Sequence, residues 1–115
     1  MITISVDECY AYDYLAILSV KHEKINNEKT LTAKELCNEH LLNQVGESKH
    51  IEILSSQEFK NLFDINAETF DAIEKVRHGN ISAKEVDDLN MQRYTYKITL
   101  QSKFFPLQQI LEAKS

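Results

Sequence analysis

The sequence predicts an all-α fold, an irregular bundle of four to five helices, and three observations support this. Only two of the 115 residues are Gly and one is Pro, so long uninterrupted helices are permitted. Apolar residues recur at helical spacing along most of the chain. A Ser or Thr is followed three residues later by Glu, the spacing of a helix capping box, at four places: Ser5/Glu8, Thr32/Glu35, Ser55/Glu58 and Ser82/Glu85. These pairs predict four helix starts within a single helical domain, residues 1–115.

The first part of the chain is expected to form two helices. The first has its helical spacing in Tyr10, Tyr14, Ile17 and Leu18 and extends to about residue 24. It is apolar on more than one face, which predicts that it is the most buried helix. Residues 25–30 are polar and predict a loop, and the second helix is expected to begin at Thr32 and to end at Gly46.

Residues 48–54 are expected to be a connection, because their apolar residues alternate weakly instead of following a helical stripe. Residues 2–6 also alternate between apolar and polar side chains. The alternative to an entirely helical chain is therefore a minor two-stranded ribbon that joins residues 2–6 to residues 50–54.

The middle of the chain is expected to hold a third helix beginning at Ser55. A fresh helix could start at Asp64 or Asn66, or the two could form one continuous helix. Basic residues precede Gly79, where positive charge meets the negative end of the helix dipole. We therefore expect this helical segment to end at Gly79.

The longest segment begins at Ser82 and extends to Pro106. Residues 94–100 alternate as in a strand, but no Gly, Pro or turn cluster separates them from the residues before them. We therefore predict a helix here and keep a strand as the alternative. A short final helix is expected after Pro106, because Pro suits a first-turn position.

Composition excludes several classes of function. The net charge is −5 and no Lys/Arg-rich stripe is evident, so nucleic-acid binding is not expected. No apolar run approaches the roughly 20 residues of a membrane span. No leader segment is recognisable at the start, and a cytoplasmic location is the resulting expectation. Cys9 and Cys37 are far apart and are expected to be reduced, small core residues.

No motif for catalysis, a metal or a cofactor is present. Glu-x-x-His, the pair used by di-metal bundles, occurs once, as Glu47/His50, directly after the expected helix end at Gly46. No nucleophile motif or Gly-rich phosphate loop occurs, and two glycines are too few to build one. An enzyme is therefore the less favoured class, and we expect no cofactor and no metal.

One polar line near the C-terminus is a candidate site. If the segment is helical, four polar residues lie three or four residues apart, between apolar ridges: Asn90, Arg93, Lys97 and Gln101. Arg93 could bind a carboxylate or phosphate with its guanidinium fork. One interpretation is an anion-binding crevice, with charge from Arg93 and Lys97 and with Tyr10 or Tyr14 as facing walls.

The other interpretation of this line is an internal network that fixes the register of the helices. Its acidic partners would come from Asp7, Asp13, Asp71 or Glu74. Such a network is tolerated inside a protein only when its members are well paired.

The leading functional hypothesis is a small, acidic, non-enzymatic protein-interaction domain that acts through helix faces, with a protein partner or a second copy of itself in a homodimer. Exposed tyrosines would suit such an interface. The alternative is a small-molecule or anion-binding domain that uses Arg93 and Lys97. An enzyme working in the same crevice is a third class.

Overall fold

The computed structural model describes residue 2, residues 4–79 and residues 82–107. Five helices make up this part of the chain: α1 (Glu8–Ile25), α2 (Glu28–Val45), α3 (Glu47–Leu54), α4 (Gln57–Arg77) and α5 (Ala83–Phe104). No strand occurs among these residues. The predicted all-α bundle is confirmed.

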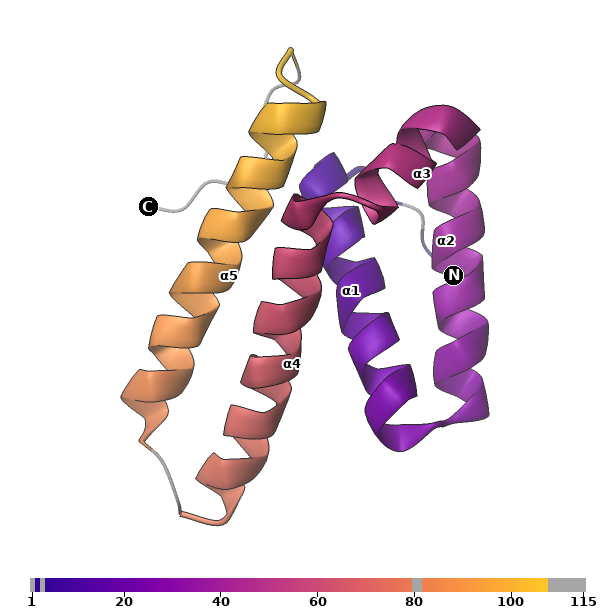
Figure 1. Ribbon diagram of the computed structural model, residues 1–115. Helices are drawn as coiled ribbons and strands as arrows, with labels where there is room; N and C mark the ends of the chain where they lie inside the picture. Colours follow the sequence, from indigo (N-terminus) through magenta and orange to yellow (C-terminus); the bar gives the residue numbers. More distant parts are fainter. Residues whose placement is uncertain (1, 3, 80–81, 108–115) are drawn as a thin grey trace.

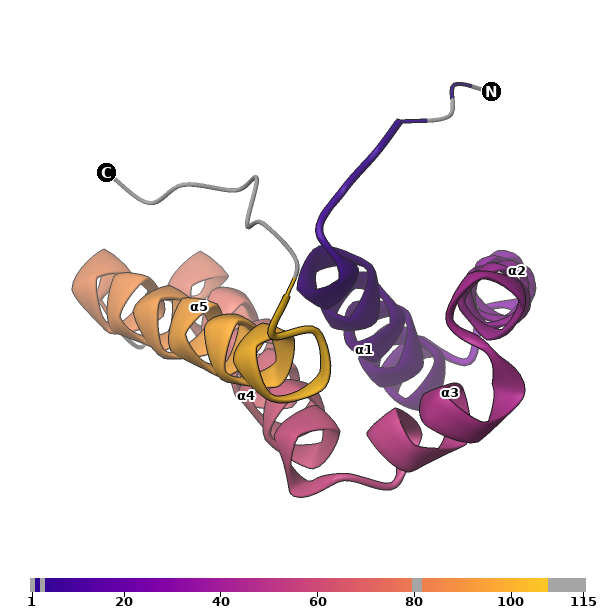
Figure 2. The ribbon, with the colours of Figure 1, turned by 90° about the horizontal axis from the view of Figure 1, so that it is seen from above.

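The helices form two antiparallel hairpins that α3 connects. α1 and α2 form one hairpin, and α4 and α5 form the other (Figure 1). Seen from above, α1 lies between α2 and the second hairpin (Figure 2), and it packs against α2, α4 and α5. α1 is therefore the central helix, as its several apolar faces predicted. The two hairpins diverge at the end away from α3.

The core lies at the end of the bundle where α3 crosses. It draws on the first half of α1, the start of α4, the last turns of α5 and single residues of α2 and α3. The largest fully buried side chains are Tyr12, Ile53, Leu62, Leu100, Gln101 and Cys9. Ring contacts of Tyr12 with Phe59 and Phe105 link α1 to α4 and to the end of α5. Each Å² of apolar surface removed from water stabilises the folded state by about 25 cal/mol, so this end of the bundle is the main source of stability.

Two of the four predicted capping boxes are wrong. α1 begins at Glu8 after Asp7, so Ser5 lies outside the helix. α2 begins at Glu28 after Asn27, whose side chain accepts hydrogen bonds from the next helical N–H groups. Thr32 is therefore inside α2, and the polar loop predicted over 25–30 is much shorter. Asn is as good an N-cap as Ser or Thr, and the capping-box pattern does not include it.

The other two boxes are close to real helix starts. Ser55 ends α3, and its neighbour Ser56 caps α4 by accepting from the Phe59 N–H at 3.1 Å. Ser82 is the N-cap of α5 as predicted, although its side chain makes no capping bond. The pattern thus located these two starts to within one residue.

Residues 48–54 form most of α3, so the predicted connection and the ribbon with residues 2–6 are both wrong. Residues 2 and 4–6 have no regular structure. α4 is one continuous helix and ends at Arg77, close to Gly79, and residues 94–100 are helical as predicted. Gly46 ends α2 with φ +99°, which favours glycine. The final helix expected after Pro106 falls largely outside the described residues.

Candidate functional site

The predicted polar line faces α1 along a seam between α1 and α5. Arg93 Nε lies 3.4 Å from Asp13 Oδ2, an ion pair in which the Asp13 side chain is only 4% exposed. Arg93 also donates to Asn90 Oδ1 on its own helix at 3.3 Å. Asp13 is one of the four acidic partners expected for an internal network. The guanidinium thus has a partner within the fold.

Asn66 of α4 completes this cluster. Its Nδ2 donates to Asp13 Oδ1 at 2.9 Å and to the Leu62 carbonyl at 2.9 Å. The two carboxylate oxygens of Asp13 therefore face partners on two different helices. A buried carboxylate is tolerated when it is paired and hydrogen-bonded in this way. The cluster fixes how α4 and α5 sit on α1.

Gln101 performs a different task at the start of α1. Its Oε1 accepts from the Cys9 N–H at 2.9 Å, and its Nε2 donates to Glu8 Oε1 at 2.9 Å. The first N–H groups of a helix have no partner within the helix, and Asp7 makes no side-chain cap. A residue 92 positions away on α5 therefore does the capping that the sequence assigned to Ser5.

Lys97, Tyr10 and Tyr14 complete the predicted site residues. Lys97 is 4% exposed, and its Nζ lies 5.3 Å from the centre of the Tyr10 ring and 6.0 Å from that of Tyr94. Tyr10 and Tyr14 are each 48% exposed on α1. The structure therefore places Lys97 beneath Tyr10, with aromatic faces next to its cation.

A second buried polar cluster joins α1, α2 and α3, and the sequence did not predict it. The Tyr12 hydroxyl lies 2.8 Å from His50 Nδ1, and His50 Nε2 lies 2.7 Å from Asn38 Oδ1. Since Oδ1 only accepts, Nε2 carries the proton and the Tyr12 hydroxyl donates to Nδ1. Burial lowers the pKa of His50. Burial also raises the pKa of Tyr12, and the nearby thiol of Cys37 raises the Tyr12 pKa further. Both groups are therefore held neutral.

An open groove lies on the opposite side of α1 from the seam. Two adjoining hollows of about 430 and 420 Å³ share Leu54 and Phe59. The first is lined by Leu15, Ser19, Leu31, Lys34, Glu35, Asn38, Leu54 and Phe59. The second continues along α4 past Lys60 to Phe63 and Asp64. We call the two hollows together the α2–α4 groove.

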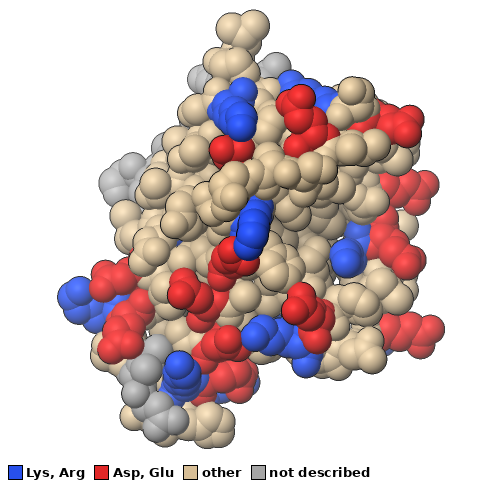
Figure 3. Space-filling view, in the orientation of Figure 1, with Lys and Arg blue, Asp and Glu red and all other residues tan. Residues whose placement is uncertain are grey.

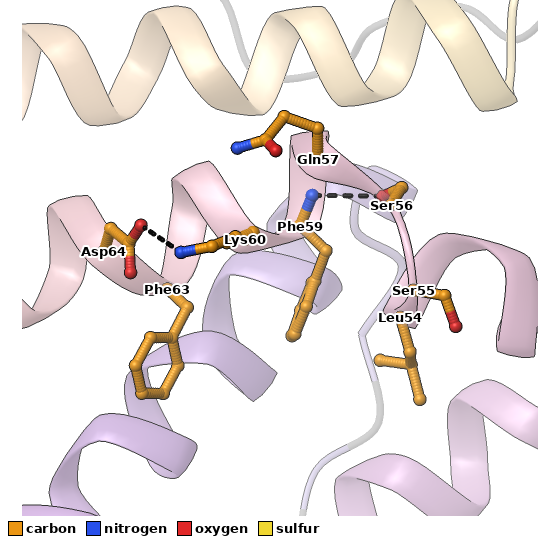
Figure 4. A pocket seen from close by; sticks show the side chains of 8 residues that line it. All are labelled: Leu54, Ser55, Ser56, Gln57, Phe59, Lys60, Phe63 and Asp64. Atoms are coloured by element: carbon orange, nitrogen blue, oxygen red, sulfur yellow. Dashed lines mark hydrogen bonds and ion pairs between the residues drawn. The ribbon is translucent and has the colours of Figure 1, made fainter.

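Three apolar side chains of the groove project in the same direction from α3 and α4. Figure 4 shows Leu54, Phe59 and Phe63 pointing away from α5, toward the side on which α1 and α2 lie. Leu15 of α1 forms the floor and Leu31 of α2 stands on the far wall. Leu15 is only 2% exposed, so the apolar surface that the groove presents comes from its two walls.

Charged side chains stand at the edges of this groove. Lys60 and Asp64 pair with each other on α4 at 3.1 Å. Lys34 and Glu35 stand on α2, and neither forms an ion pair with another described residue. In Figure 3 the middle of this face, between α4 and α2, is largely uncharged, and acidic side chains gather along the edge over α2 and α3.

Sequence reasoning missed the groove because its residues are scattered over four helices. Leu54 lies in the segment predicted as a connection, and Phe59 and Phe63 belong to a helical stripe that is equally typical of core residues. One available signal was Leu31, an apolar residue directly before the predicted helix start at Thr32 and therefore outside that helix. α2 has one buried side chain, Leu41, so most of its apolar side chains stay at least partly exposed.

Other kinds of site find little support in the described part of the chain. It contains no group of three or more His, Cys, Asp or Glu side chains that could hold a metal ion. Cys9 and Cys37 are both free thiols, and burial raises the pKa of Cys37, which makes its thiol a poorer nucleophile at neutral pH. None of the described helices has the length and apolar composition that crossing a membrane requires.

Comparisons with known proteins give no relative from which a function could be transferred. No protein-family model matches the chain, and searches of curated proteins and of solved structures found no match. The geometry of the seam and of the groove is therefore what indicates a function.

Proposed function

We propose that the protein is a non-enzymatic interaction domain that binds a protein partner in the α2–α4 groove. The observation that carries this proposal is the set of partly exposed apolar side chains along an open hollow: Leu31, Leu54, Phe59 and Phe63. Apolar surface left in contact with water is unfavourable, so covering it favours binding.

The α1–α5 seam gives less support to the anion-binding alternative. Asp13 and Asn90 already engage the Arg93 side chain, and Lys97 lies almost completely covered. An incoming phosphate or carboxylate would have to compete with Asp13 for the guanidinium. The contacts of the seam favour a structural role, and the groove is the better candidate for recognition.

Two pairs of variants test the proposed function. Leu31→Gln removes apolar surface from the groove wall, whereas Leu36→Gln makes the same change five residues later at a side chain that does not line the groove. Ser19→Trp fills the floor, and because the chain contains no Trp its fluorescence also reports whether the ring lies in apolar surroundings. Ser102→Trp, at an exposed position on α5, is the matched control.

A displayed library of helical peptides is then selected against the unmodified protein, and the enriched peptides are measured against each variant by fluorescence anisotropy. We expect Leu31→Gln and Ser19→Trp to weaken binding at least tenfold, with both controls unchanged. Equal binding to all five proteins, or no enrichment at all, would contradict the proposal. Light scattering of the protein alone decides whether a second copy fills the groove, because self-association would then be lost in Ser19→Trp.

A further inference from the structure

The width of the α2–α4 groove is the first clue to what it binds. α2 and α4 each pack against α1 but share no extended contact with each other in the described chain. Packed helices lie about 8–10 Å apart, so two helices on either side of a third leave a space about one helix wide above it. α1 is visible at the bottom of this space in Figure 1, and α3 closes its upper end.

The arrangement of the apolar side chains is the second clue. Leu31 on one wall and Phe59 on the other face the space above Leu15, which is buried in the floor. Phe63 follows Phe59 one helical turn further along α4. A helix presenting apolar residues at positions i, i+3 or i+4, and i+7 would fill such a line, as amphipathic helices do in other grooves.

The distribution of charge is the third clue. The four helices around the groove, α1–α4, contain thirteen Asp and Glu against eight Lys and Arg, a net charge of −5. α5, which lies outside the groove, contains three Asp and Glu against four Lys and Arg. On the α2 wall, Lys34 and Glu35 both line the groove and neither has an ion-pair partner among the described residues, and Glu35 is the more exposed of the two. The four charged side chains that line the groove, Lys34, Glu35, Lys60 and Asp64, balance one another, so the negative excess comes from the surrounding helices and lies along the edge over α2 and α3 (Figure 3). This surrounding excess favours a positively charged partner.

We infer that the partner is an amphipathic helix with an apolar ridge and Lys or Arg along its flanks. This inference rests on the proposed function and adds the conformation and the charge of the partner. The apolar ridge covers Leu31 and Phe59 above the buried Leu15, and a basic flank lies next to Glu35 on α2. Apolar contact supplies most of the affinity, whereas the charges increase the rate of association and select the partner.

The test uses two model peptides that share one pattern of Leu residues and differ only in charge. The first carries Lys at every polar position and the second carries Glu. Binding is measured by fluorescence anisotropy near 0.15 M salt, where charges more than about 8 Å apart are largely screened. We expect the Lys peptide to bind at least tenfold more tightly than the Glu peptide, and circular dichroism to show a gain of helix on binding.

Two variants locate the charge effect. Glu35→Lys reverses the charge at the groove edge, and Glu85→Lys makes the same change in net charge at the start of α5. We expect Glu35→Lys to weaken the binding of the Lys peptide about tenfold and Glu85→Lys to weaken it less than twofold. Equal losses would mean that the Lys peptide responds only to overall charge, which would overturn the inference.

The outcomes separate this inference from the proposed function. Tighter binding of the Glu peptide, with Leu31→Gln still weakening it, would overturn the basic partner and leave the groove as a binding site. Binding without a gain of helix would overturn the helical conformation alone. If neither peptide responds to Leu31→Gln or Ser19→Trp, the groove itself is not the site and both proposals fail.

Discussion

The α1–α5 seam and the α2–α4 groove flank the same central helix and differ in how completely their side chains are partnered. In the seam, Asp13, Arg93 and Gln101 are polar and each has a partner on another helix. In the groove, Leu31 and Phe59 are apolar and line an open hollow. Side chains that already have partners on another helix indicate a structural role, whereas side chains that line an open hollow indicate a candidate binding site. Changes in the seam should therefore alter stability, and changes in the groove should alter binding.

The largest effect is expected from Arg93→Met. It leaves the buried carboxylate of Asp13 without its cation, and Asn66 remains as one hydrogen-bond donor. Breaking a buried ion pair costs about 3–5 kcal/mol, and the 29% exposure of Arg93 places this pair at the low end, about 3 kcal/mol. Denaturant unfolding measures the loss. An unchanged free energy of unfolding would mean that Arg93 contributes nothing to the fold and is available for an external anion.

A double variant sharpens this result. Asp13→Leu combined with Arg93→Met removes both charges and replaces them with apolar groups, a change that is often neutral for a buried pair. We expect the double variant to be more stable than Arg93→Met by at least about 1 kcal/mol. Additive losses in the two single variants would show that the two side chains are not coupled.

The next largest effect is expected from Gln101→Leu. The substitution keeps a side chain of similar size and leaves the Cys9 N–H without its acceptor at the start of α1. An unsatisfied buried donor costs about 1–3 kcal/mol, so we expect a loss of roughly 2 kcal/mol. Gln92→Leu, an exposed position on the same helix, is the control and should change stability by less than about 0.5 kcal/mol. Equal effects of the two variants would remove the capping role.

The contacts of Arg93 and Gln101 also show which features of the fold the sequence could predict. The all-α class and a helical 94–100 followed from local spacing, because helical periodicity is a property of neighbouring residues. An acidic partner for Arg93 was one of two interpretations of the polar line, and Asp13 was one of its four candidates. The cap on α1 did not follow from local spacing, because Gln101 reaches it from 92 residues away. His50 was expected in a connection and instead lies buried between Tyr12 and Asn38. The groove depends on the relative placement of four helices, which periodicity within any one helix does not specify.

The His50 cluster predicts a pH effect of intermediate size. Burial lowers the pKa of folded His50 below its unfolded value of about 6.5. The unfolded chain therefore takes up this proton first, so the contribution to stability is present above about pH 6.5 and declines as the pH falls below it. The free energy of unfolding, measured from pH 7.5 to 5, should fall less steeply in His50→Gln than in the unmodified protein. His40→Gln, at an exposed histidine on α2, should keep the steeper fall. Parallel profiles for all three proteins would contradict the assignment.

The smallest effect on stability is expected from the groove variant Leu31→Gln. Leu31 is half-buried on a helix wall that borders a hollow, so water can reach the new amide and no buried group loses a partner. We expect a change of about 0.5 kcal/mol, similar to that of Leu36→Gln at an exposed position on the same helix. A loss above about 2 kcal/mol would mean that Leu31 belongs to the core and that the groove closes in solution. A small loss together with weakened peptide binding would separate the two sides of α1 into a structural seam and a recognition surface.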